Sequence, residues 1–119
     1  GGEHGRQHHT EGMMGKKSRD KGKVGEREFA ALLREHGFNA RRGVQYQGGP
    51  DSPDIQCDDL GEYHIEVKRC ENLSLYKAVK QAIQDAGEKI PIIGHRRNNQ
   101  EWLCIMKADD LLDLIKGAR

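Results

Sequence analysis

Apolar residues along the chain recur at helical spacing in three stretches. In residues 24–37 Phe29, Leu32 and Leu33 stand at i, i+3 and i+4, with His36 at i+7, which places them on one face of a helix. Gly37 closes this stretch, at a position where helices commonly end. Residues 74–87 carry a similar apolar stripe, and residues 108–117 begin with acids, which the helix dipole favours there. The pattern predicts helices over these three ranges.

Other stretches are rich in residues that favour strands, and several of them alternate apolar with polar residues. Turn-forming Gly, Pro, Asn and Asp residues separate them. The expected strands cover residues 38–46, 54–57, 63–69, 90–97 and 101–107. The resulting order, α-β-β-β-α-β-β-α, predicts an α/β fold with a single mixed β-sheet of about five strands flanked by helices.

The first 22 residues differ in composition from the rest of the chain. They are rich in Gly, His and charged residues and poor in apolar ones, a composition typical of disorder. We expect residues 1–22 to be a disordered basic arm and residues 23–119 to form one folded domain. Because Met13 and Met14 are both candidate natural starts, residues 1–12 are interpreted as part of an expression tag, and their histidines are given little weight as metal ligands.

Charge and cysteine content narrow the function classes. The formal net charge is only +1, but residues 1–23 carry +3 and residues 24–119 carry −2, which favours contact between the arm and a polyanion. The three cysteines form no CxxC pair, which argues against a disulfide framework and for a reducing, cytoplasmic setting. No apolar run of about 18 residues and no secretory signal are apparent.

Acidic and basic side chains share one face of two expected strands. Side chains alternate along a strand, so Glu66 and Lys68 lie on the same face of residues 63–69. Asp54 opens the preceding strand and approaches both of them if the two strands pair through a turn at residues 58–61. Paired carboxylates suit a hard cation such as Mg²⁺. The alternative is an exposed hairpin that carries a cross-strand ion pair.

Glu26 favours the metal-site interpretation. Its neighbours at i+3 and i+7 are Phe29 and Leu33, so its carboxylate belongs to the face that should meet the sheet, whereas Glu28 is better placed for solvent. An acid in the first turn of a helix also interacts well with the helix dipole, which is the simpler explanation. That explanation does not account for an inward position, where a charge needs a partner or a metal ion.

Basic residues are spread over several elements around this expected site. Together they are candidates for a track that contacts nucleic-acid phosphates, although each alone is as readily a solvated charge. They are Lys16, Lys17, Arg19, Lys21 and Lys23 in the arm, and Arg41, Arg42, Lys77, Lys80, Arg96 and Arg97 in the body.

The order of these motifs resembles a known family. A Glu in the first helix, then "PD" at the start of a strand, then "EVK" on the next strand resemble the PD-(D/E)XK nuclease superfamily. The chain is most similar to archaeal-type and phage Holliday junction resolvases, over about residues 18–115. The resemblance implies a restriction-endonuclease-like fold, so that residues 23–119 are a nuclease domain.

The resemblance also implies roles for individual residues. Asp54 is preferred to Asp51 as the strand-opening ligand because an apolar strand begins directly after it. Ser52 matches a loop serine that some resolvases place at the DNA. The implied catalytic residues are Glu26, Asp54, Glu66, Lys68 and Gln81, and the implied metal ligands are Asp54, Glu66, Glu26 and the backbone carbonyl of Val67.

The implied function is that of a magnesium-dependent endonuclease. It would resolve four-way junctions as a homodimer, with Mn²⁺ as the alternative metal, in the cytoplasm at the nucleoid or in a phage-infected host. Three alternatives remain open: a nuclease of the same superfamily that acts on duplex or flap DNA, a non-catalytic DNA-binding module, and an interaction protein that uses the acidic closing helix. The intact set of Glu26, Asp54, Glu66 and Lys68 argues against a non-catalytic module, and an interaction protein leaves the inward position of Glu26 unexplained.

Overall fold

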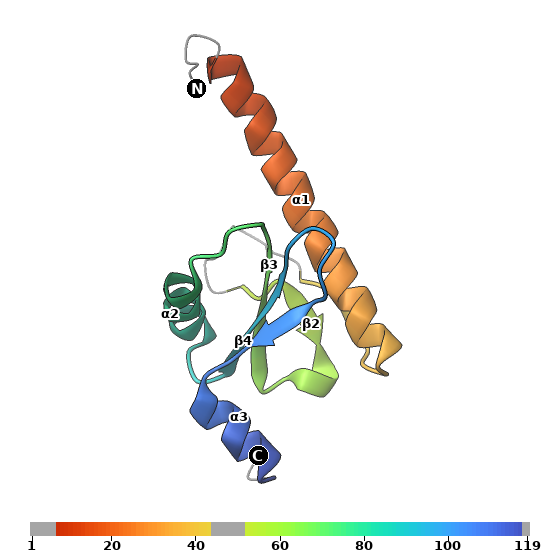
Figure 1. Ribbon diagram of the computed structural model, residues 1–119. Coiled ribbons are helices and arrows are strands. Elements are labelled where there is room, and N and C mark those ends of the chain that lie inside the picture. The colour runs from red at the N-terminus through yellow and green to blue at the C-terminus, as the bar shows by residue number, and fades with distance from the viewer. Residues whose placement is uncertain (1–6, 44–51, 118–119) are drawn as a thin grey trace.

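The computed structural model describes residues 7–43 and 52–117, and the side chains of residues 21–43 and 52–117. The elements within these ranges follow the expected order, with a short 3₁₀-helix between the second and third strands (Figure 1). They are α1 (Gln7–Glu35), β1 (Ala40–Arg42), β2 (Ile55–Cys57), η2 (Asp58–Leu60), β3 (Tyr63–Arg69), α2 (Leu75–Ala86), β4 (Ile90–Arg96), β5 (Leu103–Ile105) and α3 (Ala108–Ile115). The mixed α/β class and the order of helices and strands are confirmed.

The strands form two hydrogen-bonded sheets in the described residues, not the single sheet expected. β1 and β2 pair antiparallel, while β3 pairs parallel with β4 and β4 pairs antiparallel with β5. The expected hairpin of β2 with β3 is therefore wrong. β2 is only three residues long, and one of its edges is hydrogen-bonded to β1. Toward β3, the Asp54 N–H donates to the Ile65 carbonyl oxygen at 3.0 Å, but the Val67 N–H is taken by the Asp54 side chain.

Helices cover β3 from both sides. α1 packs on β1 and β3, and α2 packs on β3 and β4 from the opposite side (Figure 1). Residues 64–67 of β3 are consequently all buried, which contradicts the alternative of an exposed hairpin for this strand. The reason is the parallel β3–β4 pairing, because parallel strands are usually covered on both faces.

The core lies between α1 and the strands. Phe29 and Ile93 are almost fully buried, and the Phe29 ring packs against Trp102 with ring centroids 5.0 Å apart. α1 approaches closely because glycines leave room for it: a Cβ at Gly25 would lie 2.6 Å from the Arg69 Cβ, and one at Gly94 would lie 2.8 Å from the Phe29 ring. This packing fixes the depth at which α1 sits on β3 and β4.

α1 begins at Gln7, within the arm that the composition predicted to be disordered. Starting a helix is the costly step, whereas extending an existing helix adds one hydrogen bond per residue. The packed turns around Phe29 supply the nucleus, and the Lys, Arg, Gln and Glu residues before them are good helix formers. The described residues include no helix that is long and apolar enough to cross a membrane.

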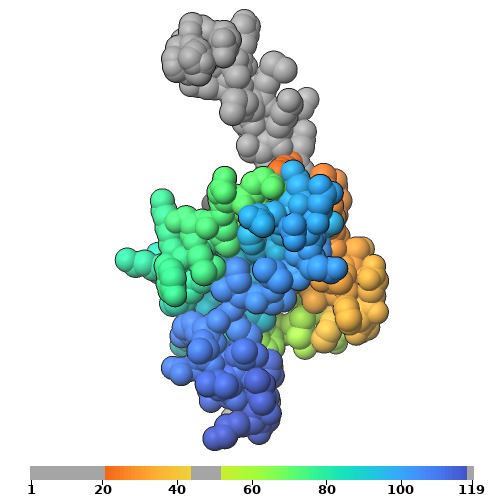
Figure 2. Space-filling view, in the orientation of Figure 1, coloured from red at the N-terminus to blue at the C-terminus, as the bar shows by residue number. Residues whose placement is uncertain are grey.

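α3 projects from the body of the molecule (Figure 2), and in Figure 1 it lies at the end opposite the start of α1. Four of its apolar side chains are exposed: Leu111, Leu112, Leu114 and Ile115. The neighbouring strand β5 also exposes an apolar side chain, since Leu103 is 59% exposed.

Candidate active site

Asp54 is the centre of the acidic site. It lies directly before β2, and its Oδ2 accepts the Val67 N–H of β3 at 2.8 Å. Its pKa is raised from 3.8 to about 6, chiefly because burial penalises the charged form. The charges of Glu26 and Glu66 raise this pKa further, while the Val67 N–H and Lys68 lower it. The structure therefore brings Asp54 together with the three charged residues expected around it.

Glu66 contributes the second carboxylate from the middle of β3. Only 6% of it is exposed, because α2 covers this side of the strand. Its Oε2 lies 3.1 Å from Nε2 of His64, which is 3% exposed. A carboxylate buried this deeply needs a partner, and His64 lies within hydrogen-bond distance of it.

Glu26 extends from α1 toward β1 and Asp54. Its side chain is 16% exposed, and its Oε1 accepts a hydrogen bond from Arg42 Nε at 2.9 Å. Of the two acidic neighbours, Glu26 has the larger effect on the pKa of Asp54. The inward position expected for Glu26 is thus observed, but Arg42 offsets its charge, a contact that the sequence did not predict.

Val67 and Lys68 complete the site on β3. The N–H and C=O of one residue in a strand point toward the same edge. Since the Val67 N–H points toward Asp54, the Val67 carbonyl oxygen lies on the same edge of β3. Lys68 is partly buried, and its charge lowers the pKa of Asp54. Two carboxylates, a carbonyl oxygen and a nearby third acid are oxygen ligands of the kind that a hard divalent cation prefers.

Gln81 reaches this region indirectly. It lies exposed on α2, and its Nε2 donates to Asp85 Oδ1 at 3.0 Å. Asp85, His64 and Glu66 offer ligand atoms within 4.8 Å of one another. Neither His64 nor Asp85 is among the site residues expected from the sequence. The available signals were local: His64 stands two residues before Glu66 on the same strand face, and Asp85 stands four residues after Gln81 on the same helix face.

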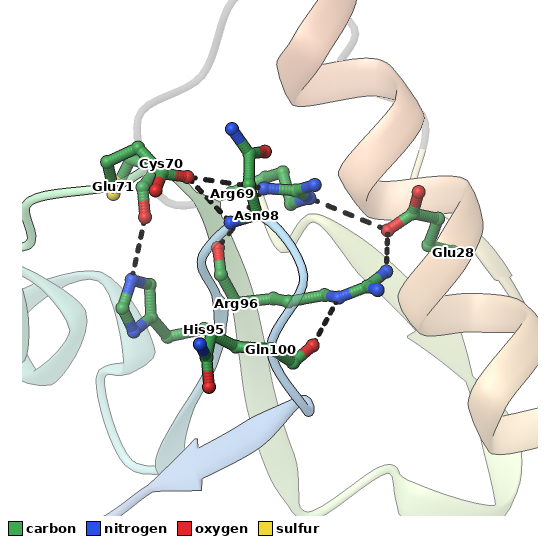
Figure 3. Close-up of polar contacts among 8 residues, drawn as sticks. All are labelled: Glu28, Arg69, Cys70, Glu71, His95, Arg96, Asn98 and Gln100. Carbon is green, nitrogen blue, oxygen red and sulfur yellow. Dashed lines mark hydrogen bonds and ion pairs between the residues drawn. The ribbon is translucent and has the colours of Figure 1, made fainter.

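A second polar network fixes α1 to the ends of β3 and β4 (Figure 3). Glu28 was expected to face solvent, but its Oε1 lies 3.1 Å from Arg96 Nη1 and 3.6 Å from Arg69 Nε. Arg96 Nε also donates to the Gln100 carbonyl oxygen, and the Asn98 N–H donates to a Glu71 carboxylate oxygen. This network lies beside Glu26 in sequence and so restrains the turn of α1 that presents Glu26 to Asp54.

The proposed DNA-contacting residues are placed unevenly. Lys16, Lys17 and Arg19 belong to α1, but their side chains are outside the described residues. Asp51, the alternative to Asp54 as a metal ligand, also lies outside the described residues. Arg42 and Arg96 are engaged by Glu26 and Glu28. Ser52 and Lys21 are partly buried, and the exposed basic residues are Lys23, Arg41, Lys77, Lys80 and Arg97. The structure thus leaves basic side chains exposed on α1, β1, α2 and the segment after β4.

Comparison with known proteins identifies the family. Residues 17–113 match the family described as "Archaeal holliday junction resolvase (hjc)". The chain belongs to this family. It is also similar to a solved structure of Hjc, a Holliday junction resolvase from the archaeal hyperthermophile Archaeoglobus fulgidus, with 27% sequence identity, a TM-score of 0.54 and 72% of each chain covered. Among curated proteins, none matches this chain.

The family and the structural match confirm the resemblance to PD-(D/E)XK resolvases. They identify the chain as a Holliday junction resolving endonuclease. The matched range includes every proposed site residue except Lys16, from Lys17 in α1 through Gln81 in α2. The roles of the individual residues remain proposals.

Proposed function

We propose that the acidic site around Asp54 is a magnesium site for phosphodiester hydrolysis in branched DNA. Asp54 and Glu66 hold the cation, with the Val67 carbonyl oxygen as a further ligand. The observation that carries this proposal is the placement of Asp54 against β3: its Oδ2 accepts the Val67 N–H at 2.8 Å, beside the buried Glu66. Burial and the charges of Glu26 and Glu66 raise the pKa of Asp54 accordingly. Such a set of carboxylates is unfavourable without a cation and becomes favourable when a divalent ion binds.

Each residue has a separate task in the proposed reaction. A Mg²⁺ ion held by Asp54 and Glu66 would supply the polarisation of the scissile phosphate and the activation of water. Lys68 orients the attacking water and offsets negative charge at the phosphate, and Glu26 holds a second ion or a bridging water on the α1 side. Gln81 steadies the site through Asp85. The water oxygen adds to phosphorus and the bond to O3′ breaks, which leaves a 5′-phosphate and a 3′-hydroxyl.

DNA binding is assigned to basic residues on both sides of this site. Lys21 and Lys23 lie on the turns of α1 directly before Glu26, together with Lys16, Lys17 and Arg19 farther along the helix. Arg41, Arg42 and Ser52 lie toward β1 and β2, and Lys77 and Lys80 are exposed on α2. A homodimer would present two such sites to a junction that is itself nearly two-fold symmetric.

The test uses labelled four-way junction, flap and linear duplex of matched length. With Mg²⁺ we expect cleavage of the junction in preference to the other two substrates, with no cleavage in EDTA, and a parallel series with Mn²⁺ compares the two metals. Equal cleavage of all three substrates would indicate a general nuclease activity and contradict selective junction resolution. Tight junction binding without cleavage in either metal would indicate a DNA-binding module.

A further inference from the structure

Glu66 lies between the acidic site and a second group of possible metal ligands. On the α2 side, the atoms offered by His64, Glu66 and Asp85 all lie within 4.8 Å of one another. His64 and Glu66 come from β3, and Asp85 comes from α2, which packs on β3 and β4. Two segments far apart in sequence thus converge on one imidazole and two carboxylates.

The chemistry of this group differs from that of the magnesium site. Mg²⁺ takes oxygen ligands and retains several waters, whereas an imidazole nitrogen favours borderline metals such as Zn²⁺. His64 Nε2 and Glu66 Oε2 are 3.1 Å apart. Two ligands of a tetrahedral Zn²⁺ with bonds of about 2.0–2.1 Å lie about 3.3 Å apart, so this pair is already spaced to share one ion.

Asp85 is positioned to supply the third ligand. It is partly buried, and its Oδ1 accepts the hydrogen bond from Gln81. Metal-binding carboxylates are commonly oriented in this way by a second hydrogen bond, which leaves the other oxygen to face the ion. Gln81 therefore restrains Asp85 without competing for the metal.

We propose that His64, Glu66 and Asp85 form a site for a borderline divalent metal ion, with Zn²⁺ as the probe, and that occupation of this site inhibits cleavage. The inhibitory part rests on the proposed function: Glu66 serves both sites, so a zinc ion that holds Glu66 on the α2 side withdraws it from the magnesium ion beside Asp54. The metal-binding part stands independently of cleavage.

Binding is measured first, without DNA. Because the chain carries six histidines, three of them in residues 1–12, the background is the full chain with His4, His8 and His9 replaced by alanine. Zn²⁺ affinity is obtained by competition with a chromophoric chelator, and Co²⁺ reports tetrahedral geometry by its visible absorption. We expect one ion per chain, abolished by His64→Gln and weakened about tenfold or more by Asp85→Asn.

Three variants test the assignment against simpler explanations. His36→Gln and Glu88→Gln remove an exposed histidine and an exposed acid elsewhere, and both should keep the affinity of the background protein. Asp54→Asn should keep Zn²⁺ binding, since Asp54 is not a ligand of this site. Asp85 is partly exposed on α2, so Asp85→Asn remains informative if the buried His64→Gln variant does not fold.

The second measurement is Mg²⁺-dependent junction cleavage titrated with Zn²⁺. We expect inhibition in the background protein and a rise of about tenfold or more in the Zn²⁺ concentration for half-inhibition in Asp85→Asn. Unchanged Zn²⁺ affinity in both His64→Gln and Asp85→Asn would overturn the site and leave the His64–Glu66 contact as a hydrogen bond alone. Absence of cleavage under all conditions would instead refute the nuclease function, while the Co²⁺ spectrum would still decide the metal site.

Discussion

Replacing Asp54 by Asn tests the electrostatics on which the active-site assignment depends. Asn keeps an oxygen that can accept the Val67 N–H, but it removes the charge that burial, Glu26 and Glu66 make unfavourable. Raising the pKa from 3.8 to about 6 corresponds to at most about 3 kcal/mol, since one pKa unit is worth about 1.4 kcal/mol. The substitution should therefore increase the stability of the metal-free protein at neutral pH by up to this amount.

Proton linkage determines how the stability difference between Asp54→Asn and wild type changes with pH. Because the pKa of Asp54 is raised in the folded state, the folded protein binds this proton more tightly than the unfolded chain does. The resulting stability is fully present below pH 3.8 and disappears as the pH rises through about 6. The stability difference between Asp54→Asn and wild type should thus grow by about 1.4 kcal/mol per pH unit between about pH 4 and 6, and become constant above about pH 7.

The assay is urea unfolding of the metal-free protein in EDTA at several pH values, for wild type, Asp54→Asn and the exposed-acid control Glu88→Gln. The difference between variants cancels the titration of groups that do not interact with Asp54. Added Mg²⁺ should stabilise wild type but not Asp54→Asn, and junction cleavage should be abolished in the variant while junction binding survives. A stability difference that does not change between pH 4 and 7.5 would refute the assigned burial of the Asp54 charge, and wild-type cleavage would refute its role.

Three further predictions use other parts of the structure. Glu26→Gln should strongly reduce cleavage while leaving metal-free stability unchanged or higher, whereas Glu35→Gln, an exposed acid of the same helix, should leave cleavage unchanged in the same junction assay. Gly25→Ala should destabilise the protein by about 1–3 kcal/mol in urea unfolding, because the new Cβ would meet Arg69. Gly22 has open space around it, so Gly22→Ala should stabilise α1 by about 0.5–1 kcal/mol. Equal effects of the two substitutions would contradict the close packing of α1 on β3. Neutralising the basic residues of the arm, Lys16, Lys17, Arg19, Lys21 and Lys23, should weaken junction binding. The slope of log binding constant against log salt concentration should become shallower by up to about 0.9 for each DNA phosphate that the arm no longer neutralises. An unchanged slope would show that these charges are only solvated.

The sequence by itself determined the elements and the order of the charged motifs. The apolar stripe around Phe29 fixed a helix face, and Glu26 fell on that face because helical spacing depends only on local backbone geometry. Alternation along residues 63–69 placed Glu66 and Lys68 together for the same reason. The expectation that a strand begins directly after Asp54 is also met, since β2 begins at Ile55.

Only the tertiary structure decided which strands pair and which side chains meet across elements. β3 pairs with β4, about 20 residues further along the chain, and this parallel pairing buries both of its faces between α1 and α2. No local pattern specifies such a partner, because the periodicity of one segment carries no register with another. For this reason, the contact of Glu26 with Arg42 and the approach of Asp85 on α2 to His64 and Glu66 on β3 became visible only when the packed helices and strands were seen together.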